Sequence, residues 1–328
     1  MAHANISIFV PHMGCPNMCS FCNQRFIAGT EKIPDENTVI DAVSTAMLSP
    51  NYNPESTEIA FFGGSFTAID KDYMVRLLSC AYQFVEQKKV SGIRISTRPD
   101  AIDVDILSTL KKYGVTAIEL GAQSMDDDVL KLNDRGHTAE CVENASKLIK
   151  DYGFSLGLQM MTGLYGDTDE KALKTAQKII ALKPDTVRIY PTIVLQNTRL
   201  ESLYNEGVYK PQTIDEAVCL ASELLLMFKK NNINVIRTGL HSIDTTKFVA
   251  GPWHPAFKEL CDADIYLKKA LSTLKAKGEY IIYVPVGAIS KMTGQKRKNI
   301  EILKDKGFNC VVKEDSNLKE YEIYLQGM

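Results

Sequence analysis

The chain has 328 residues, of which 45% are hydrophobic, and its 38 Lys and Arg nearly balance its 40 Asp and Glu, giving a net charge of −2. This composition is that of an ordinary globular protein of about one large domain, and it excludes disorder, fibrous repeats and a chain that coats nucleic acid along its whole length. We expect no membrane segment, because no apolar run is long enough to span a bilayer. The N-terminus, MAHANISIFVPH, lacks the basic start and apolar core of a signal peptide, so we expect a cytoplasmic protein.

Strand-like segments recur along the chain, and each is followed by a helical pattern. The strands are predicted at 6–10, 58–64, 92–97, 117–123, 154–161 and 186–194, with a short seventh at 232–240, and helices at 36–48, 70–88, 103–113, 138–151 and 168–182. Asp35 and Asp70 stand where helix N-caps would be. Alternating βα units with apolar strands predict a parallel sheet covered by helices. Six units are fewer than the eight of a full TIM barrel, so the predicted fold class is α/β, a partial (β/α)6-type TIM barrel over residues 1–240.

Residues 241–278 are predicted to form a covering loop and a helix. The stretch 239–256, GLHSIDTTKFVAGPWHPA, is rich in Gly, Pro and aromatic residues. It is either a lid over the mouth of the barrel or a covering loop packed by Trp253. On the lid hypothesis, His241 or Trp253 contacts the substrate.

The last segment, 279–328, is predicted to be a small basic α+β appendage with a helix at about 294–306. Between residues 291 and 313 there are seven Lys and Arg against two acids. The helix opens with GQKR, which partly matches the GXXG loop of KH modules, although Arg297 replaces the second Gly. The candidate nucleic-acid contacts are Lys291, Lys296, Arg297 and Lys298. The alternative is a solvated basic helix face that completes the fold.

The eight cysteines are unevenly placed, and three of them, Cys15, Cys19 and Cys22, fall within eight residues. In a cytoplasmic chain such a group indicates metal binding or catalysis rather than disulfides. Zinc would need a fourth ligand, for which His12 is near, and Cys19 with Cys22 also fits a redox C-x2-C pair. A third option is a [4Fe–4S] cluster held by three thiolates, with one iron left open. The other cysteines, at positions 80, 141, 219, 261 and 310, are expected to be buried packing residues.

Chemistry in folds of this kind collects at the C-terminal ends of the strands. The unusual residues of this sequence fall there: the Cys loop, Gly63-Gly64-Ser65-Phe66, Ser96 to Asp100, Gln123, Gln159 with Met161, and Tyr190 with Pro191. One rim would bring them together. The catalytic residues stay open, with Tyr190 and His241 as candidates.

CPNMCSFC after a first strand, with GGSF after the second, resembles the radical S-adenosylmethionine (SAM) enzymes. The resemblance implies a [4Fe–4S] cluster on Cys15, Cys19 and Cys22 that reduces SAM to a 5′-deoxyadenosyl radical, with electrons from a flavodoxin- or ferredoxin-like donor. It also implies SAM contacts from Phe21, Gly63, Gly64, Ser65 and Phe66, where glycine lets the backbone approach a ligand closely.

Further motifs, STRPDAI, ELGAQS, DRGHT, MMTGLYG and RIYPTIVLQNTRL, resemble the radical SAM domain of the catalytic subunit of the Elongator complex, over roughly residues 6–210. This resemblance implies modification of the wobble uridine of tRNA, and it places Ser96, Gln123 and Arg135 against SAM. The oxygen-independent coproporphyrinogen oxidases share the layout, but their extra N-terminal substrate loops are not found. Only about a quarter of the chain follows the barrel, so we do not expect the acetyltransferase domain of the Elongator subunit.

The sequence therefore predicts a radical SAM enzyme acting on tRNA. Two alternatives remain. One is a radical SAM enzyme acting on a small molecule, with a purely structural basic appendage. The other is a non-catalytic metal- or RNA-binding protein.

Overall fold

The computed structural model describes residues 4–10, 18–23, 33–240 and 245–328. Two predicted site residues, Cys15 and His241, lie outside these ranges, as does His12. No helix within the described residues is long and apolar enough to cross a membrane.

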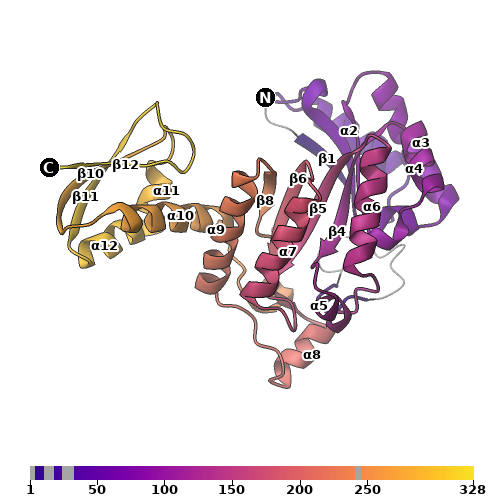
Figure 1. Cartoon of the computed structure of the whole chain (residues 1–328). Helices are drawn as coiled ribbons and strands as arrows, with labels where there is room; N and C mark the ends of the chain where they lie inside the picture. The colour runs from indigo at the N-terminus through magenta and orange to yellow at the C-terminus, as the bar shows by residue number, and fades with distance from the viewer. Residues whose placement is uncertain (1–3, 11–17, 24–32, 241–244) are drawn as a thin grey trace.

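A sheet of seven parallel strands, in the order β1-β2-β3-β4-β5-β6-β8, forms the main body (Figure 1). The strands are β1 (Ala4–Val10), β2 (Thr57–Gly63), β3 (Gly92–Thr97), β4 (Val115–Gln123), β5 (Ser155–Thr162), β6 (Thr186–Pro191) and β8 (Asn234–Thr238). The order follows the chain and leaves β1 and β8 as edges, so the sheet is a partial barrel. This confirms the predicted α/β partial barrel, including its short seventh strand.

Helices cover one face of this sheet (Figure 1). They are α2 (Glu36–Met47), α3 (Lys71–Glu86), α4 (Val104–Lys112), α5 (Asp127–Leu132), α6 (Ala139–Asp151), α7 (Asp169–Ala181) and α9 (Ile214–Lys230). Alternate strand residues such as Ile59, Ile93 and Ile118 are fully buried in the core. Asp35 and Asp70 cap α2 and α3 by accepting hydrogen bonds from the backbone N–H of Thr38 and Tyr73.

The predicted strand at 186–194 is interrupted. β6 ends at Pro191, and β7 (Val194–Leu195) pairs antiparallel with β9 (Phe248–Ala250). Proline has no N–H to donate to a neighbouring strand, and the last bond from this end of β6 to β5 is donated by the Thr192 N–H to the Thr162 carbonyl. The stretch after β8 is thereby attached to the end of the barrel, with α8 (Arg199–Asn205) following β7.

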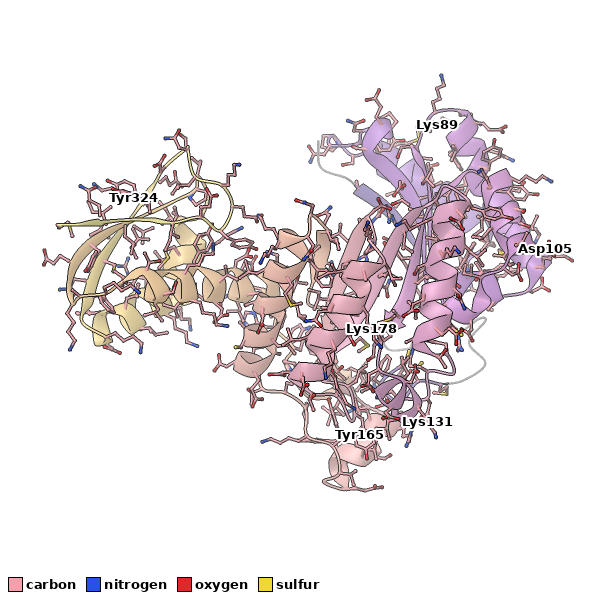
Figure 2. All side chains as sticks on the ribbon, in the orientation of Figure 1. Lys89, Asp105, Lys131, Tyr165, Lys178 and Tyr324 are labelled. Atoms are coloured by element: carbon pink, nitrogen blue, oxygen red, sulfur yellow. The ribbon has the colours of Figure 1, made fainter. Side chains whose placement is uncertain are left out.

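The C-terminal appendage stands beside α9, at the end of the long helix α10 (Phe257–Thr273) (Figure 1). It contains β10 (Gly278–Val284), α11 (Ile289–Thr293), α12 (Lys298–Asp305), β11 (Phe308–Glu314) and β12 (Tyr324–Gly327). Its sheet has the order β11-β10-β12. Ile282 and Val284 pack on Met292 and Leu303 in its interior. Figure 2 labels Tyr324 on this appendage, whereas Lys89 and Asp105 lie at the far side of the barrel.

The helix predicted at about 294–306 starts later than expected. α12 begins at Lys298, because the preceding turn has left-handed backbone angles at Gly294, Lys296 and Arg297, with φ of 73°, 50° and 64°. An α-helix cannot continue through such residues. The basic residues of GQKR therefore lie on a tight turn rather than on a helix face.

Candidate functional site

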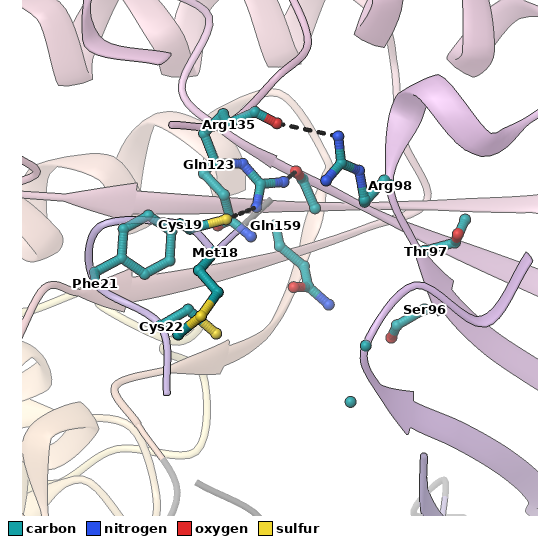
Figure 3. A pocket seen from close by; sticks show the side chains of 13 residues that line it. Met18, Cys19, Phe21, Cys22, Ser96, Thr97, Arg98, Gln123, Arg135 and Gln159 are labelled. Carbon is teal, nitrogen blue, oxygen red and sulfur yellow. Dashed lines mark hydrogen bonds between the residues drawn. The ribbon is translucent and has the colours of Figure 1, made fainter. Parts of the chain in front are cut away.

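A pocket opens at the C-terminal ends of β2 to β5 (Figure 3). It is lined by Met18, Cys19, Phe21, Cys22, Gly63, Gly64, Ser96, Thr97, Arg98, Gly121, Gln123, Arg135 and Gln159. Eight residues predicted to bind metal or cofactor are in this set: Cys19, Cys22, Phe21, Gly63, Gly64, Ser96, Gln123 and Arg135. The fold thus brings together residues that are up to 116 positions apart, such as Cys19 and Arg135.

The described part of the Cys loop is a single tight turn in which the Cys22 N–H donates to the Cys19 carbonyl, 3.0 Å away. Both thiols consequently face one pocket. The ring of Phe21 packs with a second hydrophobic cluster built on Val194, Leu200 and Tyr209. The Leu200 N–H also donates to the Ser20 carbonyl, at 2.8 Å, which ties this loop to α8.

Gly63 and Gly64 form the turn at the end of β2, and at Gly63 there is no space for a side chain. A Cβ on Gly63, whose φ is 117°, would lie 2.6 Å from the Val10 carbonyl oxygen. The Gly64 N–H donates to that same oxygen at 2.9 Å. The turn presents only backbone to the pocket, the property expected of a cradle for a closely bound ligand.

Ser65 and Phe66 are the two predicted cofactor contacts that do not line this pocket. The Ser65 hydroxyl lies 2.8 Å from the Thr97 hydroxyl and accepts a hydrogen bond from the Arg98 N–H. Phe66 stacks on Phe61 at 4.6 Å between ring centroids. Both side chains are buried, so in this structure they support the turn that carries Gly63 and Gly64.

Three buried polar atoms at the pocket have no hydrogen-bond partner among the described residues: Ser96 Oγ, Gln123 Oε1 and Arg135 Nε. Leaving such an atom unsatisfied costs about 1–3 kcal/mol. A ligand with complementary donors and acceptors would recover that energy. Together with two thiols and a glycine cradle, these atoms fit a polar cofactor such as SAM next to a thiolate-bound metal cluster.

His137 is buried close to this site. Burial and the neighbouring Arg135 lower the pKa of its ring to about 4, and Nε2 lies 3.2 Å from the Ala122 carbonyl oxygen. The ring is neutral at pH 7 and does not line the pocket, so we assign it no catalytic role.

Of the two catalytic candidates, Tyr190 lies within the described residues. It is on β6 and does not line the pocket. Burial raises the pKa of its hydroxyl, opposed by the positive charge of Arg188. Trp253 packs against Phe248 of β9, with 6.3 Å between ring centroids, which favours the covering-loop interpretation of this residue.

Sequence reasoning missed a buried belt of charges across the sheet below the pocket. Arg94 donates to Glu58 at 2.9 Å and to Glu119 at 3.3 Å, and Arg188 donates two hydrogen bonds to Glu119, at 2.7 and 2.9 Å. Gln159, which lines the pocket, donates to the same carboxylate at 3.0 Å. All four charged side chains are at most 10% exposed. A signal existed, because Arg94, Glu119 and Arg188 each interrupt an otherwise apolar predicted strand.

Comparison with known proteins agrees with this geometry. Residues 9–179, more than half of the chain, match the family model of the radical SAM superfamily, and residues 184–269 match the radical SAM C-terminal domain. The chain belongs to the radical SAM superfamily of enzymes.

Among curated proteins, this radical SAM chain is 31% identical to the tRNA uridine(34) acetyltransferase of Methanocaldococcus jannaschii, covering 67% of the chain and 48% of that protein. It is also 31% identical to Elongator complex protein 3 of Homo sapiens, covering 66% and 47%. The chain spans about half the length of the curated relatives it matches. Among solved structures, the archaeal Elp3 of Methanocaldococcus infernus has a TM-score of 0.68 at 23% identity, covering 85% of this chain and 66% of that one, which shows the shared fold.

Proposed function

We propose that this chain is a radical SAM enzyme that modifies tRNA, with a [4Fe–4S] cluster on Cys15, Cys19 and Cys22. The observation that carries the proposal is the meeting of Cys19 and Cys22 with the glycine cradle and the unpartnered polar atoms in one pocket. Held by these three thiolates, the cluster would supply the one electron needed for the reductive cleavage of SAM, chemistry that leads to hydrogen abstraction from a substrate. Cys15 lies outside the described residues, so its role rests on the sequence.

In this proposal the side chains around the cradle hold SAM. The guanidinium of Arg135 suits its carboxylate, because its buried Nε has no partner in the part of the chain that the structure describes. Ser96 and Gln123 offer a hydroxyl and a carbonyl oxygen to its other polar groups. Gln159, which the sequence places at the end of a strand, lines the pocket and donates its amide N–H to Glu119. Tyr190 and His241 remain the catalytic candidates.

The choice of tRNA rests on the relatives, whose names describe tRNA uridine(34) acetyltransferases. The basic appendage supports the choice of tRNA. In this proposal, the turn that contains Lys296 and Arg297 contacts the nucleic acid. Lys291 is paired with the buried Asp262 at 3.2 Å, and Lys298 lies 3.4 Å from Asp215, so both are less available to phosphate. We keep the KH-like comparison, the cytoplasmic location and the flavodoxin- or ferredoxin-like donor as parts of this proposal.

The proposal is tested by reconstituting the full chain anaerobically with iron and sulfide and supplying SAM and a strong reductant. We expect 5′-deoxyadenosine, formed faster with bulk tRNA than without it. Comparing modified nucleosides by mass spectrometry in cells with and without the protein should identify the product. No 5′-deoxyadenosine would refute the radical chemistry, whereas turnover that tRNA leaves unchanged, together with an unchanged nucleoside profile, would favour the small-molecule alternative.

A further inference from the structure

The connector between α5 and α6, residues 133–138, is hydrogen-bonded to the Cys loop. Asn133 is fully buried; its carbonyl oxygen accepts the Ser20 N–H at 3.1 Å, and its Oδ1 accepts the Ser20 hydroxyl at 2.7 Å. Its Nδ2 donates to the carbonyl oxygens of Val129 and Tyr165, at 2.8 and 2.9 Å. Both N–H groups of the amide are thus used. The Cys loop is fixed to α5 and to the loop after β5.

Two residues further along, Arg135 reaches the sulfur of Cys19. Its Nη1 lies 3.1 Å from Cys19 Sγ, and its Nη2 donates to the Gly121 carbonyl at 2.6 Å (Figure 3). The Arg135 carbonyl in turn accepts a hydrogen bond from Arg98, at 3.3 Å. The residue is 7% exposed. Because the guanidinium is anchored on β4 and its own backbone is held, the N–H···S contact is imposed by the fold.

We propose that Arg135 is a positioning residue that donates this hydrogen bond to the Cys19 sulfur in the loaded enzyme and thereby raises the reduction potential of the iron–sulfur cluster. The inference rests on the proposed function, since it takes Cys19 as a cluster ligand. Hydrogen bonds to ligand sulfurs and nearby charge are the protein's means of setting such potentials. The reduced cluster carries one more negative charge, so an adjacent cationic donor stabilises it more than the oxidised form.

This role is additional to a contact with SAM. A guanidinium has five N–H donors, and the contacts to Cys19 and Gly121 use two of them. The buried Nε has no partner among the described residues. One side chain can therefore contact the ligand sulfur and a cofactor carboxylate together.

The test is a redox titration of the reconstituted full chain with dithionite, followed by electron paramagnetic resonance, in the absence of SAM. Arg135→Gln removes the charge and the fixed donor, and we expect the reduced-to-oxidised ratio at a fixed potential to fall about tenfold, which is about 59 mV for one electron. Arg135→Lys keeps the charge but not the geometry, and we expect a smaller fall. If Arg135→Gln does not assemble a cluster, the reduction potential of Arg135→Lys tests the inference.

Arg199→Gln is the matched control, because Arg199 bonds to Asp134 of the same connector and to the adjoining Leu132 carbonyl of α5, on the exposed side. We expect its potential to equal that of the wild type. An unchanged potential in both Arg135 variants, or an equal shift in the Arg199 variant, would overturn the inference. Failure of the wild-type chain itself to bind iron and sulfide would instead refute the proposed function.

Discussion

The described cysteine residues of this chain fall into two groups, those that line the pocket and those that lie elsewhere in the fold. Cys19 and Cys22 lie in a tight turn at a polar pocket. Cys261 is buried, and burial raises the pKa of its thiol to about 12, which makes it an unreactive packing residue. The expectation that Cys219 is buried was wrong, because α9 turns this residue outward, where Lys268 lies 3.2 Å from its sulfur.

Replacing a pocket cysteine should therefore abolish cluster binding without unfolding the chain. We expect Cys19→Ser and Cys22→Ser to lose most of the bound iron and sulfide after reconstitution, because serine is a poor ligand for iron–sulfur clusters. Cys219→Ser, an exposed control, should retain both. Chemical analysis of iron and sulfide per chain makes the measurement. Wild-type iron content in the Cys19 variant would contradict its assignment as a ligand.

Asp167, in the loop after β5, gives the folded chain a distinct pH dependence. Burial raises the pKa of its carboxyl from 3.8 to about 6, although the N–H groups of Thr168 and Gly163 donate to it. Between these values the folded chain holds this proton and the unfolded chain does not. The contribution of Asp167 to the free energy of unfolding therefore falls as the pH rises from about 4 to about 6, and it stays low above that.

Asp167→Asn should remove this dependence. We expect the free energy of unfolding of the variant, minus that of the wild type, to increase between about pH 4 and about pH 6 and then to level off. Urea denaturation over this range measures it. The opposite contribution of His137, whose pKa is lowered to about 4, cancels in the difference. A pH-independent difference would show that Asp167 does not titrate in this window.

At the scale of elements, the strands of the barrel use their two faces differently. Toward the helices they present residues such as Ile93 and Ile118, which are fully buried and apolar. The belt of Glu58, Arg94, Glu119 and Arg188 joins β2, β3, β4 and β6 on a face that the site requires to be polar. The floor of the pocket is thus held by charges rather than by packing, and Glu119 bridges both arginines.

Glu119→Gln should destabilise the chain strongly, because it leaves two buried guanidinium groups without their shared carboxylate. Breaking a buried pair of this kind costs about 3–5 kcal/mol. Glu170→Gln, which removes an exposed pair with Lys174, should cost little. Chemical denaturation of both variants tests the comparison. A loss in Glu119→Gln as small as in the control would show that the belt does not stabilise the barrel.

In the molecule as a whole, the appendage is attached to α10 through a buried polar contact. Asp262 of α10 is 2% exposed and bonds to the Tyr321 hydroxyl and to Lys258, with Lys291 at 3.2 Å. The matched family models end at residue 269, before the appendage begins. This contact fixes the appendage, which carries the turn of Lys296 and Arg297, to α10.

Removing the charges of that turn should weaken RNA binding. We expect the double variant Lys296→Gln, Arg297→Gln to bind tRNA more weakly and to lower the slope of log affinity against log salt by about 1.4, roughly 0.7 for each phosphate contact. Lys111→Ala with Lys112→Ala, at the end of α4, is the control and should change neither quantity. Fluorescence anisotropy at several salt concentrations measures both. Equal effects in the two double variants would mean that the appendage makes no special contact with RNA.

The sequence was enough to predict the α/β partial barrel and most of the residues around the pocket, because βα periodicity and the short Cys and Gly motifs are local signals. It did not reveal the buried charges around Glu119, the hydrogen bonds of Asn133 and Arg135 to the Cys loop, or the burial of His137. Nor did it show that Ser65 and Phe66 point into the core, or that Lys291 is paired with Asp262. Most of these features depend on which side chains meet across strands and loops that are distant in the chain, such as Ser20 with Asn133 and Asp262 with Lys291. Only the tertiary structure decides such contacts, since each side chain's charge and freedom are set by neighbours distant in the chain.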